Sequence, residues 1–374
     1  MRLLAKSRLR ASALGAIAAA ALAVPAAAGA MPTAFIGHLH TISFLGGTAP
    51  AHGPAHGDQN PYGVAVVPTT AGDLRRGDVL VSNFNNAANH QGTGSSIVQI
   101  SPTGRQRVFA VVHQPTATPA VGLTTALVAL RNGDVVVGSL PAPGGTSAAM
   151  TAGALSILNP RGQVIKTLTA PDINGPWDMT ARDNGALVTL FVSNVLNGTV
   201  AANGKVVKRG TVVRIKLRFA RSGPSVLSNQ PIATGFGEHA DPSALVVGPT
   251  GLGLGRGGVL YVSDSVGNRI AAIPHALQRH SVLGGGGRTV SQGGPLNDPL
   301  GLAIAPNGDI VTANGNDGKL VETTPGGRRA ATKTLVHNGG GDLFGITLAP
   351  GGSGLYFVDD AGSGPGANSL GFLH

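Results

Sequence analysis

One short pattern recurs six times along the chain. In each copy an apolar strand leads into a glycine-centred turn, and a second apolar strand ends in Ser-Asn, Ser-Asp or a near equivalent. The best-kept copy runs from Asp298 to Asn314, and others begin at Asn60 and Asp241. Repetition of this kind, built from strands without a helical period, predicts a β-propeller.

Each copy is expected to begin with a hairpin. Asn-Gly and Gly-Gly accept positive φ at both central positions, which a tight two-residue turn requires. Such turns stand at Asn132-Gly133, Asn184-Gly185, Gly257-Gly258, Asn307-Gly308 and Gly351-Gly352, and the first copy has a longer connection from Asp73 to Gly77. Aligned on the turns, the first strands lie near Gly63, Ala126, Asp178, Ala244, Gly301 and Gly345.

Two further strands follow within each unit, around Pro-x-Gly turns in the segments 95–112, 153–168 and 318–336. The last copy has room for only a third strand, whereas the segment 35–45 is a strand without a hairpin partner. We therefore predict an all-β, six-bladed propeller of four-stranded antiparallel blades, closed by the N-terminal strand so that no sheet edge is left open. Seven blades is the alternative, if the long interval between the third and fourth copies contains a degenerate one.

Composition limits the class of protein. The 374 residues include 58 Gly and 25 Pro but only 12% charged residues, which suits short strands and tight turns and excludes an all-helical fold. There is no Cys, so no disulfide framework is possible. The basic residues are not clustered with aromatic ones, so a nucleic-acid partner is not expected.

The first 30 residues have the features of a secretory signal peptide. Arg2, Lys6, Arg8 and Arg10 precede an apolar stretch from 11 to 24, and small residues follow at 28–30. Cleavage near Ala30 would leave residues 31–374 as a single propeller domain, secreted or periplasmic and not integral to a membrane. It removes four of the 27 basic residues and none of the 17 acidic ones, leaving a net charge of +6. The alternative is a retained membrane anchor, although the apolar run is shorter than the ~20 residues that span a bilayer.

The repeated residues resemble a known family. An apolar strand, Pro-Asn-Gly-Asp, Leu-Tyr-Val-Ser-Asp and, once, Gly-Asn-Arg-Ile at 267–270 are similar to the NHL repeat, and more distantly to gluconolactonase and senescence-marker-protein propellers. The pattern covers residues 60 to 360. This resemblance implies a propeller that serves as a lactonase, lyase, arylesterase or binding protein. The gluconolactonase-type site uses a Glu near the start of the mature chain, and here the first Glu is Glu238.

Asx residues flank the strands of nearly every copy. In a propeller the innermost strand begins, and the second ends, at the same face, so these side chains are expected around one channel mouth. The residues before the inner strands include Asn60 and Asp241, and those that end the second strands include Asn83, Asn194, Asp264, Asn314 and Asp360. Carboxylate and amide oxygens suit a hard cation, so the second set is a candidate site for calcium or another divalent cation. The competing interpretation is that each Asx fixes its own turn.

Histidines supply a second set of candidates on the same face. His52 and His56 precede the first inner strand, His90 follows Asn83, and Glu238 and His239 precede the fourth copy. Imidazole beside a carboxylate could bind a metal or act as a general base. A His-Glu pair in a propeller mouth also resembles the lyase that opens cyclic streptogramins. The competing interpretation is a set of solvated loop histidines.

Two functions are consistent with these residues. In the first, the protein is a binding or interaction module whose mouth loops contact a small molecule, glycan or protein through Asn60, His52, His56, His90, Trp177 and Asp241. In the second, it is a divalent-metal-dependent hydrolase, lactonase or lyase that uses the Asx ligands and has His239, assisted by Glu238, as its base. Loops on a rigid scaffold usually carry recognition.

Overall fold

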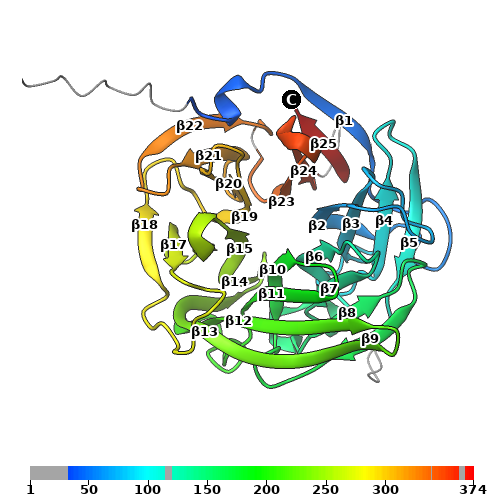
Figure 1. Ribbon diagram of the computed structural model, residues 1–374, viewed down its shortest axis with the longest axis horizontal. Helices are drawn as coiled ribbons and strands as arrows, with labels where there is room; N and C mark the ends of the chain where they lie inside the picture. Colours follow the sequence, from blue (N-terminus) through cyan, green and yellow to red (C-terminus); the bar gives the residue numbers. More distant parts are fainter. Residues whose placement is uncertain (1–32, 114–119, 338, 362–366) are drawn as a thin grey trace, which may run out of the picture. The chain divides into compact units, whose positions relative to one another are not determined.

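The computed structural model describes residues 33–113, 120–337, 339–361 and 367–374. The predicted signal peptide, residues 1–30, lies outside the described residues. Six antiparallel sheets are arranged as the blades of a propeller, with β2, β6, β10, β15, β19 and β23 innermost (Figure 1). The predicted six-bladed fold is confirmed. Within the described residues, no helix is long and apolar enough to cross a membrane.

The blades follow one another along the chain, and the strands of each blade are ordered from the axis outward. Blade 1 consists of β2 (Gln59–Val66), β3 (Val79–Asn85), β4 (Ser96–Ile100) and β5 (Gln106–Val111). Blade 2 consists of β6 (Leu123–Ala129), β7 (Val135–Ser139), β8 (Ala154–Leu158) and β9 (Val164–Leu168). Blade 3 consists of β10 (Pro176–Asp183), β11 (Leu187–Asn194), β12 (Val207–Ala220) and β13 (Gly223–Asp241), with the short β14 (Leu245–Val247) on β13.

The remaining blades are regular. Blade 4 consists of β15 (Pro249–Leu254), β16 (Leu260–Asp264), β17 (Arg269–Ile273) and β18 (Arg288–Gln292). Blade 5 consists of β19 (Pro299–Ile304), β20 (Ile310–Asn314), β21 (Lys319–Thr323) and β22 (Arg329–Thr334). Blade 6 consists of β23 (Leu343–Leu348), β24 (Leu355–Asp359), β25 (Ser369–Leu373) and the N-terminal β1 (Ile42–Gly47). Short 3-10 helices lie at η1 (Ile36–His38), η2 (Pro143–Gly145), η3 (Ser147–Ala149), η4 (Arg256–Gly258) and η5 (Pro350–Gly352).

The ring closes as the sequence predicts. β1 pairs with β25, so the outermost strand of blade 6 comes from the other end of the chain. Before β1, the backbone N–H groups of Phe35 and Ile36 each donate to the buried Glu322 carboxylate of blade 5, at 2.8 Å. The N-terminal segment is thereby held on blade 5 as well as blade 6, and both ends of the chain stabilise the closed ring.

The long interval between the third and fourth copies contains no additional blade within the described residues. It is occupied by the β12–β13 hairpin, whose strands are 14 and 19 residues long. The predicted start of the fourth inner strand, near Ala244, is wrong. Asp241 accepts hydrogen bonds from the backbone N–H groups of Ser243 and Ala244, so the chain turns back and forms β14 against β13 before β15 begins at Pro249.

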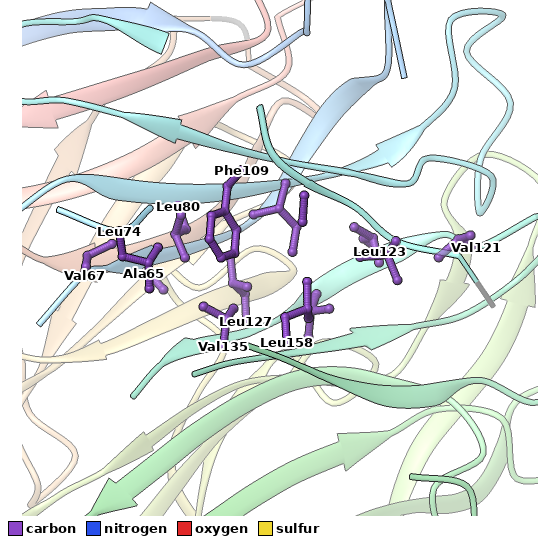
Figure 2. Packing of buried hydrophobic residues seen from close by; sticks show 14 residues of the cluster. Ala65, Val67, Leu74, Leu80, Phe109, Val121, Leu123, Leu127, Val135 and Leu158 are labelled. Atoms are coloured by element: carbon purple, nitrogen blue, oxygen red, sulfur yellow. The ribbon is translucent and has the colours of Figure 1, made fainter. Parts of the chain in front are cut away.

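Apolar side chains fill the spaces between blades. The second strands β3, β7, β16, β20 and β24 are buried along their whole length, because each packs against a neighbouring blade on both faces. Between blades 1 and 2, Leu80 and Phe109 pack against Leu127, Val135 and Leu158 (Figure 2). This inter-blade packing accounts for the runs of apolar residues without polar alternation.

Neighbouring inner strands approach most closely at one level of the central channel, which we call the waist. Every inner strand shifts register with its second strand there. The waist residues are Gly63, Thr125, Asp178, Gly251, Gly301 and Gly345. At each of the four glycines, a Cβ atom would lie closer than 3.0 Å to an atom of the next blade. Thr125 instead donates from its hydroxyl to the Trp177 carbonyl, and the Asp178 carboxylate accepts the Leu252 N–H at 3.0 Å.

Candidate functional site

The residues that precede the inner strands divide the channel mouth into two halves. In blades 5 and 6 they are Asp298 and Asp342, and the matching residue of blade 1, the next blade around the ring, is Asn60, the second residue of β2. In blades 2, 3 and 4 they are Gly122, Gly175 and Gly248. Polar side chains therefore project from one half of the mouth, and the other half is open to side chains from the loops.

Asn60 and Asp298 are held in the same unusual conformation. Both have left-handed backbone angles, with φ of 59° and 57°. The Asn60 N–H donates to Asn368 Oδ1 at 2.7 Å, and the Asp298 N–H donates to Asn268 Oδ1 at 3.2 Å. Each acceptor precedes the third strand of the preceding blade. The Asn of the Gly-Asn-Arg-Ile segment at 267–270 thus positions a mouth residue of the next blade.

A cavity of about 440 Å³ lies at this mouth. Aromatic side chains form much of its apolar wall. The Tyr62 ring lies between Phe84 and Phe344, with centroids 4.4 and 4.2 Å away, and Trp177 meets Tyr62 edge-on at 5.8 Å. Tyr62, Trp177 and Phe344 contribute directly to the cavity lining, together with Leu300 and Val246. The volume and the enclosed apolar wall are typical of sites for small molecules.

Unpartnered acceptor oxygens also line this cavity. Within the described structure, Asn60 Oδ1, Asn85 Oδ1 and Gln91 Oε1 are buried without a hydrogen-bond partner. The Asn85 and Gln91 amide nitrogens are engaged, donating at 2.7 Å to Asn89 Oδ1 and to the Ser243 carbonyl. Asn60 and Asn85 are only 6% and 3% exposed. Since buried polar atoms are nearly always hydrogen-bonded, these three oxygens are available to a bound molecule that donates.

Two carboxyl groups lie among the same lining residues. Burial raises the pKa of Asp298, and burial together with the nearby Asp342 and Asp359 carboxyls raises the pKa of Asp360 to about 7. Burial, together with the Asp360 and Asp298 carboxylates, also raises the pKa of Tyr62. The ionised form of these carboxyl groups is therefore poorly solvated at the mouth, and a cationic partner would stabilise it.

Four of the predicted metal ligands lie outside this cavity and hydrogen-bond locally. Asn83 donates to Ser96 Oγ and the Thr48 carbonyl, and Asn194 accepts from the Gly175 N–H. Asp264 pairs with Arg269 at 2.7 Å, and Asn314 accepts from the Asn297 N–H and donates to Asp317. Among the described residues, no group of three or more His, Cys, Asp or Glu could hold a metal ion. Asn83 Oδ1 is buried without a partner, whereas the oxygens of the other three side chains accept hydrogen bonds from nearby residues.

Two further Asx candidates, Asp360 and Asp241, do not occupy the strand positions that the sequence predicts. The residue that ends the second strand of blade 6 is Asp359, which pairs with Leu343, whereas Asp360 follows it and lines the cavity. Asp241 precedes β14 and not an inner strand. Its carboxylate is bound by the Ser243 hydroxyl and by two backbone N–H groups, which lower its pKa despite partial burial.

The structure separates the predicted Glu238-His239 pair. The two are consecutive residues of β13, so their side chains point to opposite faces. Glu238 is fully buried and accepts from the Asn197 N–H at 2.8 Å and from the Thr199 hydroxyl, and burial raises its pKa to about 7. His239 lies close enough to Asp298 to oppose part of the rise in pKa that burial causes there, and close enough to Asp241 to add to the hydrogen bonds that lower the pKa of that group. The side chains of His52, His56 and His90 are exposed, and none of them lines the cavity.

Several residues that line the cavity are not among the sequence candidates. Tyr62, Leu300 and Phe344 occupy the same place in their copies as Trp177, directly before the waist residue. A column alignment of the six copies would have found them. No repeat signal marks Asn85, Gln91 or Ser243, because they lie in loops or at a strand end that differ between copies.

No protein-family model matches the sequence, and no curated protein matches it. Solved structures do share its fold. A calcium-binding regucalcin from Agrobacterium tumefaciens is 13% identical, with a TM-score of 0.53 over 88% of this chain and 93% of its own. A PQQ-bound aldose sugar dehydrogenase from Streptomyces coelicolor is 17% identical, with a TM-score of 0.52 over 89% and 97%. A gluconolactonase from Xanthomonas campestris is 15% identical, with a TM-score of 0.50 over 84% and 86%.

The chain has the fold of the gluconolactonase and regucalcin propellers. The more distant resemblance, to gluconolactonase-type propellers, is thereby confirmed for the architecture, and the NHL repeat stays a prediction. At these identities the similarity extends to the fold alone, so the chemistry of the site depends on the residues of this chain.

Proposed function

We propose that this protein is a small-molecule-binding propeller whose ligand occupies the mouth cavity. The observation that carries the proposal is the presence of three buried, unpartnered acceptor oxygens beside an aromatic wall. Leaving such groups without partners lowers stability by about 1–3 kcal/mol each, which a bound ligand would recover. The basic and apolar N-terminus supports export, so the ligand would be met outside the cytoplasm.

The shape of the site favours a small molecule over a glycan chain or a protein. The unpartnered oxygens and the aromatic rings lie inside the cavity, and the predicted histidines of the outer loops do not line it. A large partner would contact mainly the rim, and the buried acceptors would remain unpartnered. A ligand of about ten heavy atoms can enter the cavity and reach both the oxygens and the rings.

Trp177 provides the test. It is the chain's one tryptophan, and it lines the cavity, so its emission should change when a ligand binds. We expect at least one member of a panel of sugars, lactones, amines and carboxylates to alter that emission and raise the melting temperature. Ser243→Tyr, which places a ring at the exposed rim, should abolish both responses.

The matched control is Ser222→Tyr, at the exposed tip of the β12–β13 hairpin. It introduces the same side chain far from the mouth and should respond as the wild type does. Equal responses from the Ser243 and Ser222 variants, or no response to any member of the panel, would contradict the proposal.

A second candidate is a divalent-metal-dependent hydrolase or lactonase with its site at the same mouth. The observation that favours it is that Asn60, Asp298 and Asp360 bring three oxygen-bearing side chains to one cavity, in a fold shared with a calcium-binding regucalcin. These three residues would hold the cation; of the strand-end set predicted from the sequence, only Asp360 is among them. The metal would supply Lewis-acid activation of a carbonyl.

Calcium distinguishes the two candidates. If the metal hypothesis is correct, millimolar calcium should raise the melting temperature by several degrees, chelator should reverse the change, and Asp298→Asn should remove it. No change with calcium, magnesium, manganese or zinc would leave the binding function as the remaining candidate.

A further inference from the structure

The charge of the cavity is opposite to that of the chain. The whole sequence has 27 Lys and Arg against 17 Asp and Glu. The mouth cavity nevertheless contains Asp298 and Asp360, and none of the described residues that line it is Lys or Arg. An anionic ligand would be repelled by these groups when they are ionised, whereas a cationic ligand would stabilise their ionised form.

The hydrogen-bonding capacity of the cavity points the same way. Its three unpartnered buried atoms, on Asn60, Asn85 and Gln91, are all acceptors. Asn60 and Asn85 are more than nine-tenths buried. A ligand that satisfies them must donate hydrogen bonds. A protonated amine has up to three donors and no acceptor, so it matches this set.

The size and the aromatic wall of the cavity indicate what kind of molecule carries the positive charge of the ligand. A bare ion would leave most of the 440 Å³ and the ring surfaces of Trp177 and Phe344 without contacts. An apolar or aromatic body would bury against these rings, and aromatic faces also attract cations.

We infer that the mouth cavity binds an organic cation, a small amine with an apolar body whose ammonium group lies between the Asp298 and Asp360 carboxylates and the amide oxygens. The inference rests on the proposed binding function and specifies the ligand class. The titratable groups around the ammonium position are Asp298, Asp360, Asp342, Asp359, Asp241, Tyr62 and His239.

The test compares phenethylamine with its neutral counterpart 2-phenylethanol and its acidic counterpart 3-phenylpropanoate, by titration calorimetry on the full mature chain. We expect the amine to bind at least tenfold more tightly than the alcohol, and the acid not to bind. Asp298→Asn and Asp360→Asn should each weaken amine binding about tenfold and reduce the advantage of the amine over the alcohol by the same factor. Asp73→Asn, which removes an exposed carboxylate from the first turn, should change neither.

The outcomes separate this inference from the proposed function. If a sugar or lactone binds and Ser243→Tyr abolishes its binding, while phenethylamine gains nothing over the alcohol, the amine inference is wrong and the binding function stands. If calcium alone binds, the amine inference is wrong and the metal alternative is supported. If no compound binds, both proposals fail.

Discussion

Replacing Gly301 by alanine is expected to lower the free energy of unfolding by about 3 kcal/mol. Gly301 is a waist residue of blade 5, and an added Cβ would overlap the Phe344 carbonyl oxygen of blade 6. It would also lie 3.0 Å from the Ile346 nitrogen. All these atoms belong to the backbone of the adjoining inner strand, so relief requires the two blades to separate. The strain would then reach the inter-blade packing on both sides.

The control for this prediction is Gly326→Ala in the same blade. Gly326 lies in the turn between β21 and β22, and an added Cβ there has only the Thr324 hydroxyl oxygen within 4 Å, at 3.9 Å. Urea denaturation of both variants measures the difference. If the free energies of unfolding of Gly301→Ala and Gly326→Ala differ by less than about 0.5 kcal/mol, the waist is not a tight contact between blades.

The repeat predicted the fold because each blade is specified locally. Its turns need residues that tolerate positive φ, its second strand is buried on both faces, and these requirements recur in each copy. The closing strand was predicted for the same reason, since the last copy lacked one strand and the N-terminus had a spare one. The fourth inner strand was misplaced because Asp241-Pro242 resembles Asp298-Pro299, and only the β13–β14 contact shows that the chain turns back there.

The site was less predictable, because strand alternation decides which side chains reach the mouth. An Asx at the end of a second strand looks the same in sequence whether it faces the channel or its own blade. Asn83 and Asp264 face their own blades. Asn60 lines the cavity, and its backbone orientation depends on a hydrogen bond to Asn368, more than 300 residues further along the chain. The loop oxygens of Asn85 and Gln91 carry no repeat signal that would place them.

Asp178 is the second position where we expect a large effect, and the effect should depend on pH. It is the one carboxyl group at the waist, and it accepts hydrogen bonds from the Leu252 N–H at 3.0 Å and the Met179 N–H at 2.7 Å. Burial raises its pKa from 3.8 to about 8, although these hydrogen bonds favour the charged form. Between pH 4 and pH 8 the folded protein therefore retains a proton that the unfolded chain has lost.

Because the folded state binds this extra proton, the stability contributed by Asp178 is complete below pH 4, falls as the pH rises to 8, and is constant above that. Asp178→Asn keeps an acceptor for the Leu252 N–H and has no charge to desolvate. At pH 9 we expect the variant to be more stable than the wild type by about 2 kcal/mol, a figure reduced from the full shift because the carboxyl keeps some contact with the channel. At pH 4 the two proteins should be nearly equal.

The measurement is the difference in unfolding free energy between variant and wild type at pH 4, 6, 8 and 9, since the other buried carboxyls titrate equally in both proteins. Asp73→Asn removes one charge at an exposed turn, and its free energy of unfolding should differ from that of the wild type by the same amount at every pH. If the unfolding free energy of Asp178→Asn also differs from that of the wild type by a constant amount, the waist carboxyl is ionised in the folded protein at neutral pH. In that case the Leu252 and Met179 N–H groups outweigh burial, and Asp178 joins blades 3 and 4 as a charged acceptor.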